Sequence, residues 1–246
     1  MAGAAKRPQI YERCGAKNAM SHPSDDMAKM PLGKLLSIVC VQAAIFTAVG
    51  VQIWWLSGRE LSQFVTIDIR QVLLGVAIAC TMIVLGLALF RGFPRFGEKL
   101  IRDQAHSLAF LKNKLGIGPI IILSLCAGIW EEALFRGGIL VIANDFIPFW
   151  LALIVSAGLF TVIHFAKPAV AAFIFAMGCI FGYLYFALGS LLAVMIGHAL
   201  YDVWALWFVQ AEMHRLGVFD EECRMDVSNK ISDGSHTSDS PAPGDN

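Results

Sequence analysis

Apolar runs close to the length of a membrane span constrain this chain more than any other feature. These runs cover residues 35–56, 71–90, 119–143, 148–165, 168–187 and 190–210, all approximately. A transmembrane helix needs about 20 consecutive, mostly apolar residues, because the hydrocarbon core of a bilayer is about 30 Å thick. Hydrophobic residues make up 57% of the chain and charged residues only 15%, a balance that is rare in soluble domains. We therefore predict an all-α, polytopic transmembrane helical bundle of about six spans.

Polar segments flank this apolar region. Residues 1–31 contain no apolar core, so we expect a polar N-terminal tail rather than a cleavable signal peptide, with Met27 or Met30 as an alternative start. Residues 213–246 are expected to form a polar, disordered C-terminal tail, because the sequence from Met225 onward is rich in Ser, Asp, Gly, Pro and Asn. Between the tails, residues 32–212 are expected to form one transmembrane helical domain.

The connection between the second and third spans has a different character, because it mixes basic residues with spaced apolar ones. From Phe96 to Leu115 it predicts an amphipathic helix, lying either on the membrane surface or in a solvated loop. Lys and Arg are frequent in this connection and in the N-terminal segment, and sparse between the first two spans. Since cytoplasmic segments carry an excess of Lys and Arg, we predict a multi-pass protein with both termini in the cytoplasm.

Cysteine spacing and charge narrow the possible functions. The chain has no CxxC spacing, so a thiolate metal site or a redox pair is not favoured. Free cysteines within apolar runs behave as small hydrophobic residues. The 19 basic residues balance 19 acidic ones and form no basic surface pattern, so we expect no nucleic-acid partner.

The stretch GIWEEALFRGG, residues 128–138, places three charges within the third span. A charged side chain at the centre of a spanning helix costs about 2.5–3.5 kcal/mol on insertion scales, so such residues are paired, line a cavity or take part in chemistry. Glu132 and Arg136 are four residues apart with Glu on the N-terminal side, the favoured order for a helical ion pair. Glu131 points about 100° away around the helix, so we expect the same Arg not to serve it.

Two more polar clusters lie in later spans. His164 follows Phe160 by four residues in FTVIHF, and Asp202 follows His198 by four residues in HALYD. The helical rise places Glu131 and His198 at similar depth, and His164 somewhat nearer the cytoplasm. We therefore expect the clusters to share a cavity, although each alone could be a hydrogen-bonding network between helices.

Two kinds of hydrolytic chemistry suit these side chains. A desolvated Glu131 can act as a general base on a water that His164 helps to orient, while His198 with Asp202 faces a developing oxyanion. Alternatively, Glu131, His164 and His198 could bind a zinc ion with an open position for water. No HExxH motif is present, and the spacing does not choose between the two.

The three motifs together resemble those of the CPBP family, which includes type II CaaX prenyl endopeptidases and bacterial Abi-type membrane proteins. EEALFR is similar to the family's EExxxR motif, FTVIH to FxxxH, and HALYD to HxxxN or HxxxD, all in the family's order. The motif core covers about 119–205, and the resemblance extends over roughly 70–210.

The resemblance implies an intramembrane endopeptidase of metalloprotease or glutamate type, with membrane lipid and a membrane-associated, CaaX-type or lipidated peptide substrate as partners. Glu131, His164, His198 and Asp202 would be catalytic; Glu132, Arg136 and Phe160 would support them. No cofactor is favoured, and zinc is the alternative. Asp202 departs from the Asn of many members, and can donate a hydrogen bond only when protonated.

Other functions remain open. A non-proteolytic membrane scaffold or self-immunity protein could use the same fold, and buried carboxylates could relay protons in a proton-coupled transporter.

Overall fold

The computed structural model describes residues 30–105 and 107–219. Most of the predicted tails, 1–31 and 213–246, therefore lies outside the described residues, at positions 1–29 and 220–246. The described chain is almost entirely helical and contains no strand. Its main elements are α3 (Leu32–Leu56), α4 (Ile69–Gly92), α5 (Pro94–Asp103), α6 (Ile117–Glu131), the π-helical segment η3 (Glu132–Leu140), α7 (Val141–Phe146), α8 (Phe149–Val162), α9 (Pro168–Leu188) and α10 (Leu191–Arg215).

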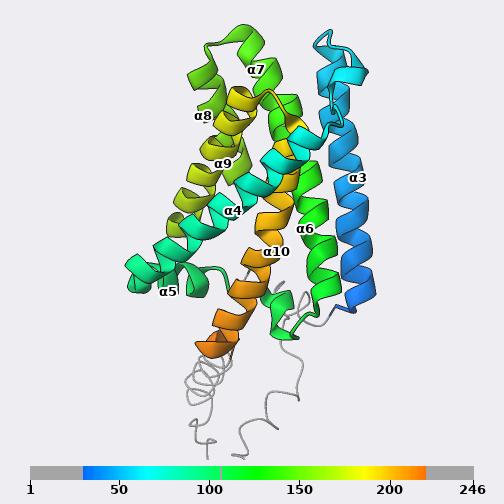
Figure 1. The fold of residues 1–246 in the computed structure, drawn as a ribbon. Coiled ribbons are helices and arrows are strands. Elements are labelled where there is room, and N and C mark those ends of the chain that lie inside the picture. Colours follow the sequence, from blue (N-terminus) through cyan, green and yellow to red (C-terminus); the bar gives the residue numbers. More distant parts are fainter. Residues whose placement is uncertain (1–29, 106, 220–246) are drawn as a thin grey trace, which may run out of the picture.

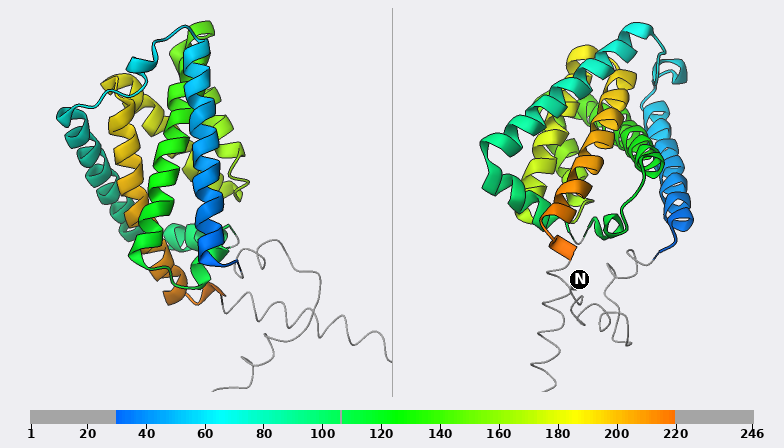
Figure 2. Two further views of the ribbon diagram at one scale, coloured as in Figure 1. Left: turned by 90° about the vertical axis from the view of Figure 1, so that its right-hand side faces the viewer. Right: turned by 60° about the horizontal axis from the view of Figure 1, so that its bottom comes forward.

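Helix α10 lies at the centre of the bundle. It packs against α4 on one side and α6 on the other, while α3 packs against α6 and η3. Helices α8 and α9 form a pair that closes the opposite flank from α3 (Figures 1 and 2). The sequence motifs lie on α6 with η3, on α8 and on α10, and these helices pack around the same interior of the bundle.

Within residues 30–105 and 107–219, five continuous helical stretches are long and apolar enough to cross a membrane, with α6, η3 and α7 counted as one. Helix α8 is apolar but has only 14 residues, so it covers about 21 Å along its axis. The predicted polytopic helical bundle of about six spans is confirmed. Helix α3 begins and α10 ends at the same end of the bundle (Figure 1).

The amphipathic segment differs from the expected continuous helix. Helix α5 ends at Asp103, and a short 3-10 turn, Ala109–Lys112, follows. Ile101 and Leu111 are buried in one cluster around Met213 of α10, and Leu100 is buried as well. A single helix through Leu115 would carry Leu111 about 15 Å from Ile101, so the chain must bend to bury both. The apolar face of α5 therefore packs against the protein rather than against lipid or water.

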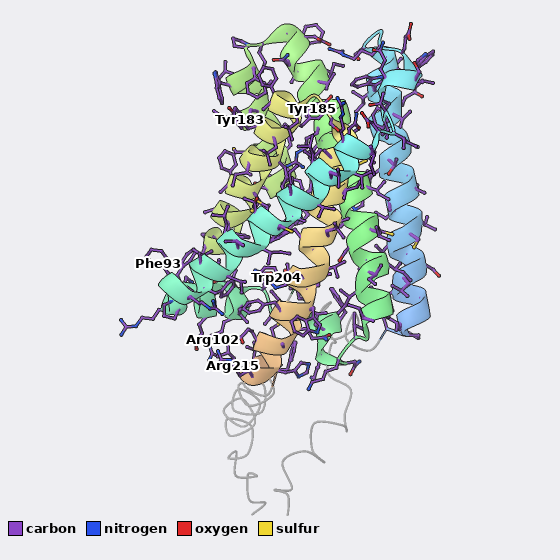
Figure 3. All side chains as sticks on the ribbon, in the orientation of Figure 1. Phe93, Arg102, Tyr183, Tyr185, Trp204 and Arg215 are labelled. Carbon is purple, nitrogen blue, oxygen red and sulfur yellow. The ribbon has the colours of Figure 1, made fainter. Side chains whose placement is uncertain are left out.

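The predicted C-terminal tail begins too early. Helix α10 continues to Arg215, and Met213, Val218 and Phe219 are buried against α5 and the turn after it. The sequence obscured this because apolar residues are sparse there and alternate with charged ones. Arg102 and Arg215 mark this end of the bundle, and Tyr183 and Tyr185 lie toward the other end (Figure 3).

Glycines allow the helices around the motifs to approach closely. A Cβ at Gly50 of α3 would collide with the carbonyl oxygen of Ala133 and lie 2.8 Å from the backbone nitrogen of Leu134. Small residues permit such close approach between helices in membranes. Helix α3 is therefore packed directly against the backbone of η3.

The contact between α3 and α6 can be tested through two cysteines. The Sγ atoms of Cys40 and Cys126 lie 3.6 Å apart, and a disulfide requires about 2.05 Å, so a small adjustment is enough to join them. We expect a mild oxidant to cross-link α3 to α6 within one molecule. The measurement is a non-reducing gel after cleavage in the connection between α4 and α6. Cys40→Ser should abolish the link, and Cys80→Ser on α4 should leave it; a link that survives Cys40→Ser would contradict this packing.

Candidate active site

The EEALFR motif lies where α6 changes into a π-helix. Glu131 is the last residue of α6, and Glu132 begins η3. Segments of π-helix are rare and are frequent at functional sites, because their wider turn moves side chains and backbone carbonyls out of α-helical register. The Ser156 hydroxyl of α8 donates a 3.0 Å hydrogen bond to the carbonyl oxygen of Phe135, which links η3 to the neighbouring helix.

Glu132 and Arg136 form a fully buried ion pair. Nη1 of Arg136 lies 3.0 Å from Oε1 of Glu132, and Nη2 donates to the carbonyl oxygen of Gly178 on α9 at 3.0 Å. The Glu132 carboxylate is 0% exposed, so these contacts take the place of water in stabilising the two charges. Glu132 Oε2 is buried and has no hydrogen-bond partner among the described residues.

Two aromatic rings flank the Arg136 guanidinium. Its centre lies 4.9 Å from the Phe160 ring and 5.9 Å from the Phe181 ring. A desolvated cation is attracted to the negative face of an aromatic ring. Helices α8 and α9 thus stabilise the charge of Arg136 from two sides, which explains how the segment tolerates it.

His198 of α10 joins this network. Its Nδ1 lies 2.7 Å from Oε1 of Glu132, the same oxygen that Arg136 binds, and its ring stacks on Phe181 at 4.9 Å. A carboxylate paired with Arg is a hydrogen-bond acceptor, so Nδ1 of His198 carries the proton. This fixes the ring and leaves Nε2 facing Glu131 and Asp202.

Glu131 and Asp202 lie around His198 Nε2 without a close bond to it. Oε2 of Glu131 is 3.6 Å from this nitrogen, and Oδ2 of Asp202 is 3.5 Å from it. Both distances exceed those of good N–H···O hydrogen bonds, which cluster near 2.9–3.0 Å. Glu131 is 8% exposed, whereas Glu132 beside it is fully buried. Of the two glutamates, Glu131 is the one that retains some solvent exposure.

His164 lies in the turn between α8 and α9. Its Nδ1 is 2.6 Å from the carbonyl oxygen of Phe160, and its ring packs on the Phe160 ring at 4.8 Å. A carbonyl oxygen only accepts, so Nδ1 is the donor and Nε2 of the neutral ring is left with a lone pair. Phe160 connects His164 to Arg136, and so to the Glu132 network.

The described residues contain no group of three His, Cys, Asp or Glu side chains arranged to hold a metal ion. The alternative set, Glu131, His164 and His198, is therefore not assembled as a ligand group. Nδ1 of each of the two histidines is already engaged, with a carbonyl oxygen or a carboxylate.

Phe181 and Gly178 are the site residues that the sequence did not indicate. Both lie on α9, in the segment GCIFG, whose two glycines stand four residues apart, a spacing that favours close helix packing. Gly178 supplies a backbone carbonyl to Arg136, and Phe181 contacts both Arg136 and His198. The signal that could have indicated Phe181 is the presence of an aromatic residue within this small-residue pattern.

Gly128 sets the distance between α6 and α10. A Cβ there would lie 2.7 Å from the backbone nitrogen of Ala199, next to His198. We expect Gly128→Ala to separate the helices, to weaken the bond from His198 to Glu132, and to cost about 1–3 kcal/mol of stability as an overpacked contact. Thermal unfolding in detergent measures this. Gly118→Ala on the same helix has open space around it and should be silent; equal effects of the two substitutions would contradict the proposed role of Gly128.

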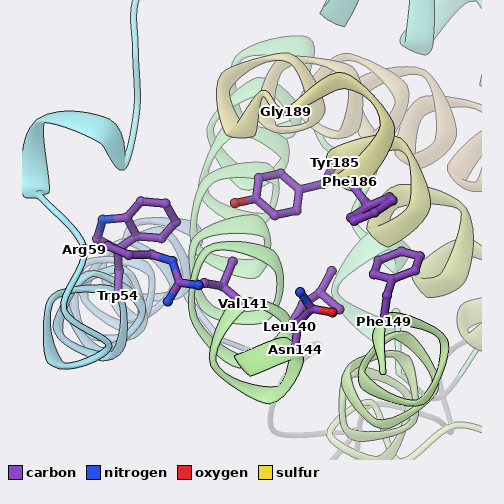
Figure 4. A pocket seen from close by; sticks show the side chains of 9 residues that line it. All are labelled: Trp54, Arg59, Leu140, Val141, Asn144, Phe149, Tyr185, Phe186 and Gly189. Carbon is purple, nitrogen blue, oxygen red and sulfur yellow. The ribbon is translucent and has the colours of Figure 1, made fainter. Parts of the chain in front are cut away.

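A separate cavity of about 230 Å³ lies toward the end of the bundle that contains Tyr185 (Figure 3). Arg59, Asn144 and Tyr185 line it together with aromatic rings (Figure 4). Arg59 there binds both carboxylate oxygens of Asp145, at 2.6 and 2.8 Å, which ties the α3–α4 connection to α7. None of the EEALFR, FTVIH or HALYD side chains lines this cavity, so it is distinct from the site around Glu131.

The fold and this cluster define a polytopic helical membrane protein with buried carboxylates and histidines gathered between its helices. Residues 113–204 match a family model described as type II CAAX prenyl endopeptidase Rce1-like. The matched segment holds all three motifs, and the resemblance to the CPBP family is confirmed. The match supports a protease, and it suggests a CAAX-type enzyme that works in a membrane. No curated protein and no solved structure gives a significant match to the chain.

Proposed function

We propose that the protein is an intramembrane endopeptidase that hydrolyses a peptide bond of a membrane-associated, CaaX-type substrate with a water activated by Glu131 and His164. The observation that carries this proposal is the contrast between two adjacent glutamates. Glu132 is fully buried and bonded to Arg136 and His198, while Glu131 is partly accessible and lies 3.6 Å from His198 Nε2. The Glu132 carboxylate holds the side chains of the site together, and the Glu131 carboxylate is available to react.

In the proposed reaction, Glu131 accepts a proton from water, and the resulting hydroxide attacks the carbonyl carbon of the scissile bond. Nε2 of His164 accepts a hydrogen bond from the same water, since its Nδ1 is held by the Phe160 carbonyl oxygen. The proton on Glu131 then passes to the leaving amine as the C–N bond breaks. The proton taken from water therefore ends on the amine product, the hydroxide ends on the acyl product, and Glu131 is regenerated as a carboxylate.

His198 is the proposed oxyanion donor. Three carboxyl groups surround it, so its Nε2 can carry a second proton and donate it to the negative oxygen of the tetrahedral intermediate. Asp202 faces the same nitrogen at 3.5 Å, which supports a role in holding and charging His198 rather than in contacting substrate. This assigns to Asp202 a task that does not require a donated hydrogen bond.

The test is mass spectrometry of cleavage products from a pool of prenylated and unmodified CaaX-type peptides. Purified wild type, Glu131→Gln and Glu60→Gln are compared in detergent with a chelator present. Glu60 is an exposed glutamate in the α3–α4 connection and serves as the matched control. We expect fragments from wild type and Glu60→Gln, and none from Glu131→Gln.

Other outcomes separate the alternatives. Cleavage that disappears with chelator and returns with zinc would replace the metal-free mechanism by a metal-dependent one. Fragments from Glu131→Gln at the wild-type rate would remove Glu131 from the reaction. No fragments from wild type in either condition, with bound peptide retained, would favour a scaffold that binds without cutting.

A further inference from the structure

Phe165 has the most unusual backbone conformation in the described part of the chain. Its φ is +44°, and it is the one non-glycine residue with positive φ among the residues described. For a bulky side chain this region is a genuine outlier, because the Cβ atom crowds the following carbonyl oxygen. Glycine would adopt the same conformation without this cost.

Packing does not explain why a phenylalanine occupies this position. The residue is 91% exposed, so its ring gains almost no burial within the protein. The backbone conformation is unfavourable for any residue with a side chain, and burial of the Phe165 side chain does not compensate for that cost. Backbone strain that no packing contact compensates tends to occur at functional positions.

The turn holds this ring beside the candidate site. Phe165 follows His164 directly, and consecutive Cα atoms are about 3.8 Å apart. Backbone hydrogen bonds from His164 to Thr161 and from Phe165 to Val162 close the turn, at 3.1 and 3.2 Å. Two residues later, Nζ of Lys167 lies 3.7 Å from Oδ1 of Asp103, which connects the turn to α5. The backbone of Phe165 therefore has a fixed position relative to His164.

We propose that Phe165 is a specificity-determining residue that contacts an apolar or lipid group of the substrate, beside the bond that is cut. This rests on the proposed function, because it places the scissile bond at His164. The strained backbone directs a rigid ring outward, where an apolar substrate group approaching from the membrane meets it. Because the backbone of the turn is already held, little backbone freedom is lost when the substrate binds, which favours affinity.

A lipid anchor is the competing explanation, since aromatic residues are enriched at membrane boundaries. The two explanations differ in what they predict in detergent. An anchor would affect every substrate alike, or none once the bilayer is gone. A substrate contact would affect only substrates that carry the apolar group.

The experiment compares two peptides of one cleaved sequence, with S-farnesyl or S-methyl on the same cysteine, in detergent. Phe165→Gly relieves the backbone, and Phe165→Ala removes the ring while retaining the strain. Phe146→Ala is the matched control, because Phe146 is also a strongly exposed phenylalanine, at 82%, but lies at the end of α7. The readouts are kcat, KM and the melting temperature of each variant.

We expect both Phe165 variants to raise KM for the farnesyl peptide at least 10-fold, with kcat and the methyl peptide changed less than 2-fold. Phe165→Gly should melt no lower than wild type, and Phe146→Ala should behave as wild type. Unchanged KM for the farnesyl peptide in Phe165→Gly would overturn the inference, as would equal losses for both peptides. Wild type that cleaves neither peptide would overturn the proposed function, and this inference with it.

Discussion

Glu131→Gln is expected to lower the cleavage rate by about 10²- to 10⁴-fold, the usual contribution of a general base, with the protein still folded. Glutamine keeps the size of the side chain but cannot accept the proton of the attacking water. Glu131 has no close ion-pair partner, with His198 Nε2 at 3.6 Å, so removing its charge strands no other charge. Single-turnover cleavage of the peptide found by mass spectrometry measures the rate, and thermal unfolding measures the stability.

The neighbouring glutamate provides the matched comparison. Glu132→Gln makes the same chemical change one residue away, but it removes the acceptor shared by Arg136 and His198. We expect this variant to melt clearly lower than wild type, in contrast to Glu131→Gln. A Glu131→Gln protein that is as unstable as Glu132→Gln would mean that Glu131 belongs to the structural network, and the assignment of the base would have to be revised.

The helices were predictable because each apolar run is long and ends at polar or helix-breaking residues. Pro148 and Pro168 stand at the starts of α8 and α9, where the fixed φ of proline suits a helix N-terminus. The extent of α5 was not predictable in the same way. Its break depends on Leu111 reaching Met213, a contact between residues about 100 positions apart in sequence that no local pattern reports.

The same distinction applies to the site. The Glu132–Arg136 pair follows from a four-residue spacing, and the structure contains it. The bond from His198 to Glu132 joins residues 66 positions apart, and no local spacing favours Glu132 over Glu131 as the partner. The π-helical backbone could not be predicted from local sequence either. It is associated with a contact between distant parts of the chain, the close packing of Gly50 against Ala133.

Arg136→Met is expected to lower the stability by about 3–5 kcal/mol, the cost of leaving one member of a buried ion pair without its partner. Methionine fills much of the volume between Phe160 and Phe181 but cannot balance the charge of Glu132. It also leaves the Gly178 carbonyl oxygen without its donor. Reversible unfolding in mixed micelles measures the free energy.

The double variant Glu132→Gln/Arg136→Met decides whether charge is the cause. With both charges removed, no ion is stranded, and we expect the double variant to be more stable than Arg136→Met alone. Arg59→Met is the control for an exposed ion pair: Arg59 and Asp145 are both partly solvated, and such pairs are worth about 0–1 kcal/mol. A double variant no more stable than Arg136→Met would show that the loss comes from packing and from the Gly178 contact. In that case the buried pair would not be what makes the charges of EEALFR tolerable, and the division of roles between the two glutamates would lose its main physical support.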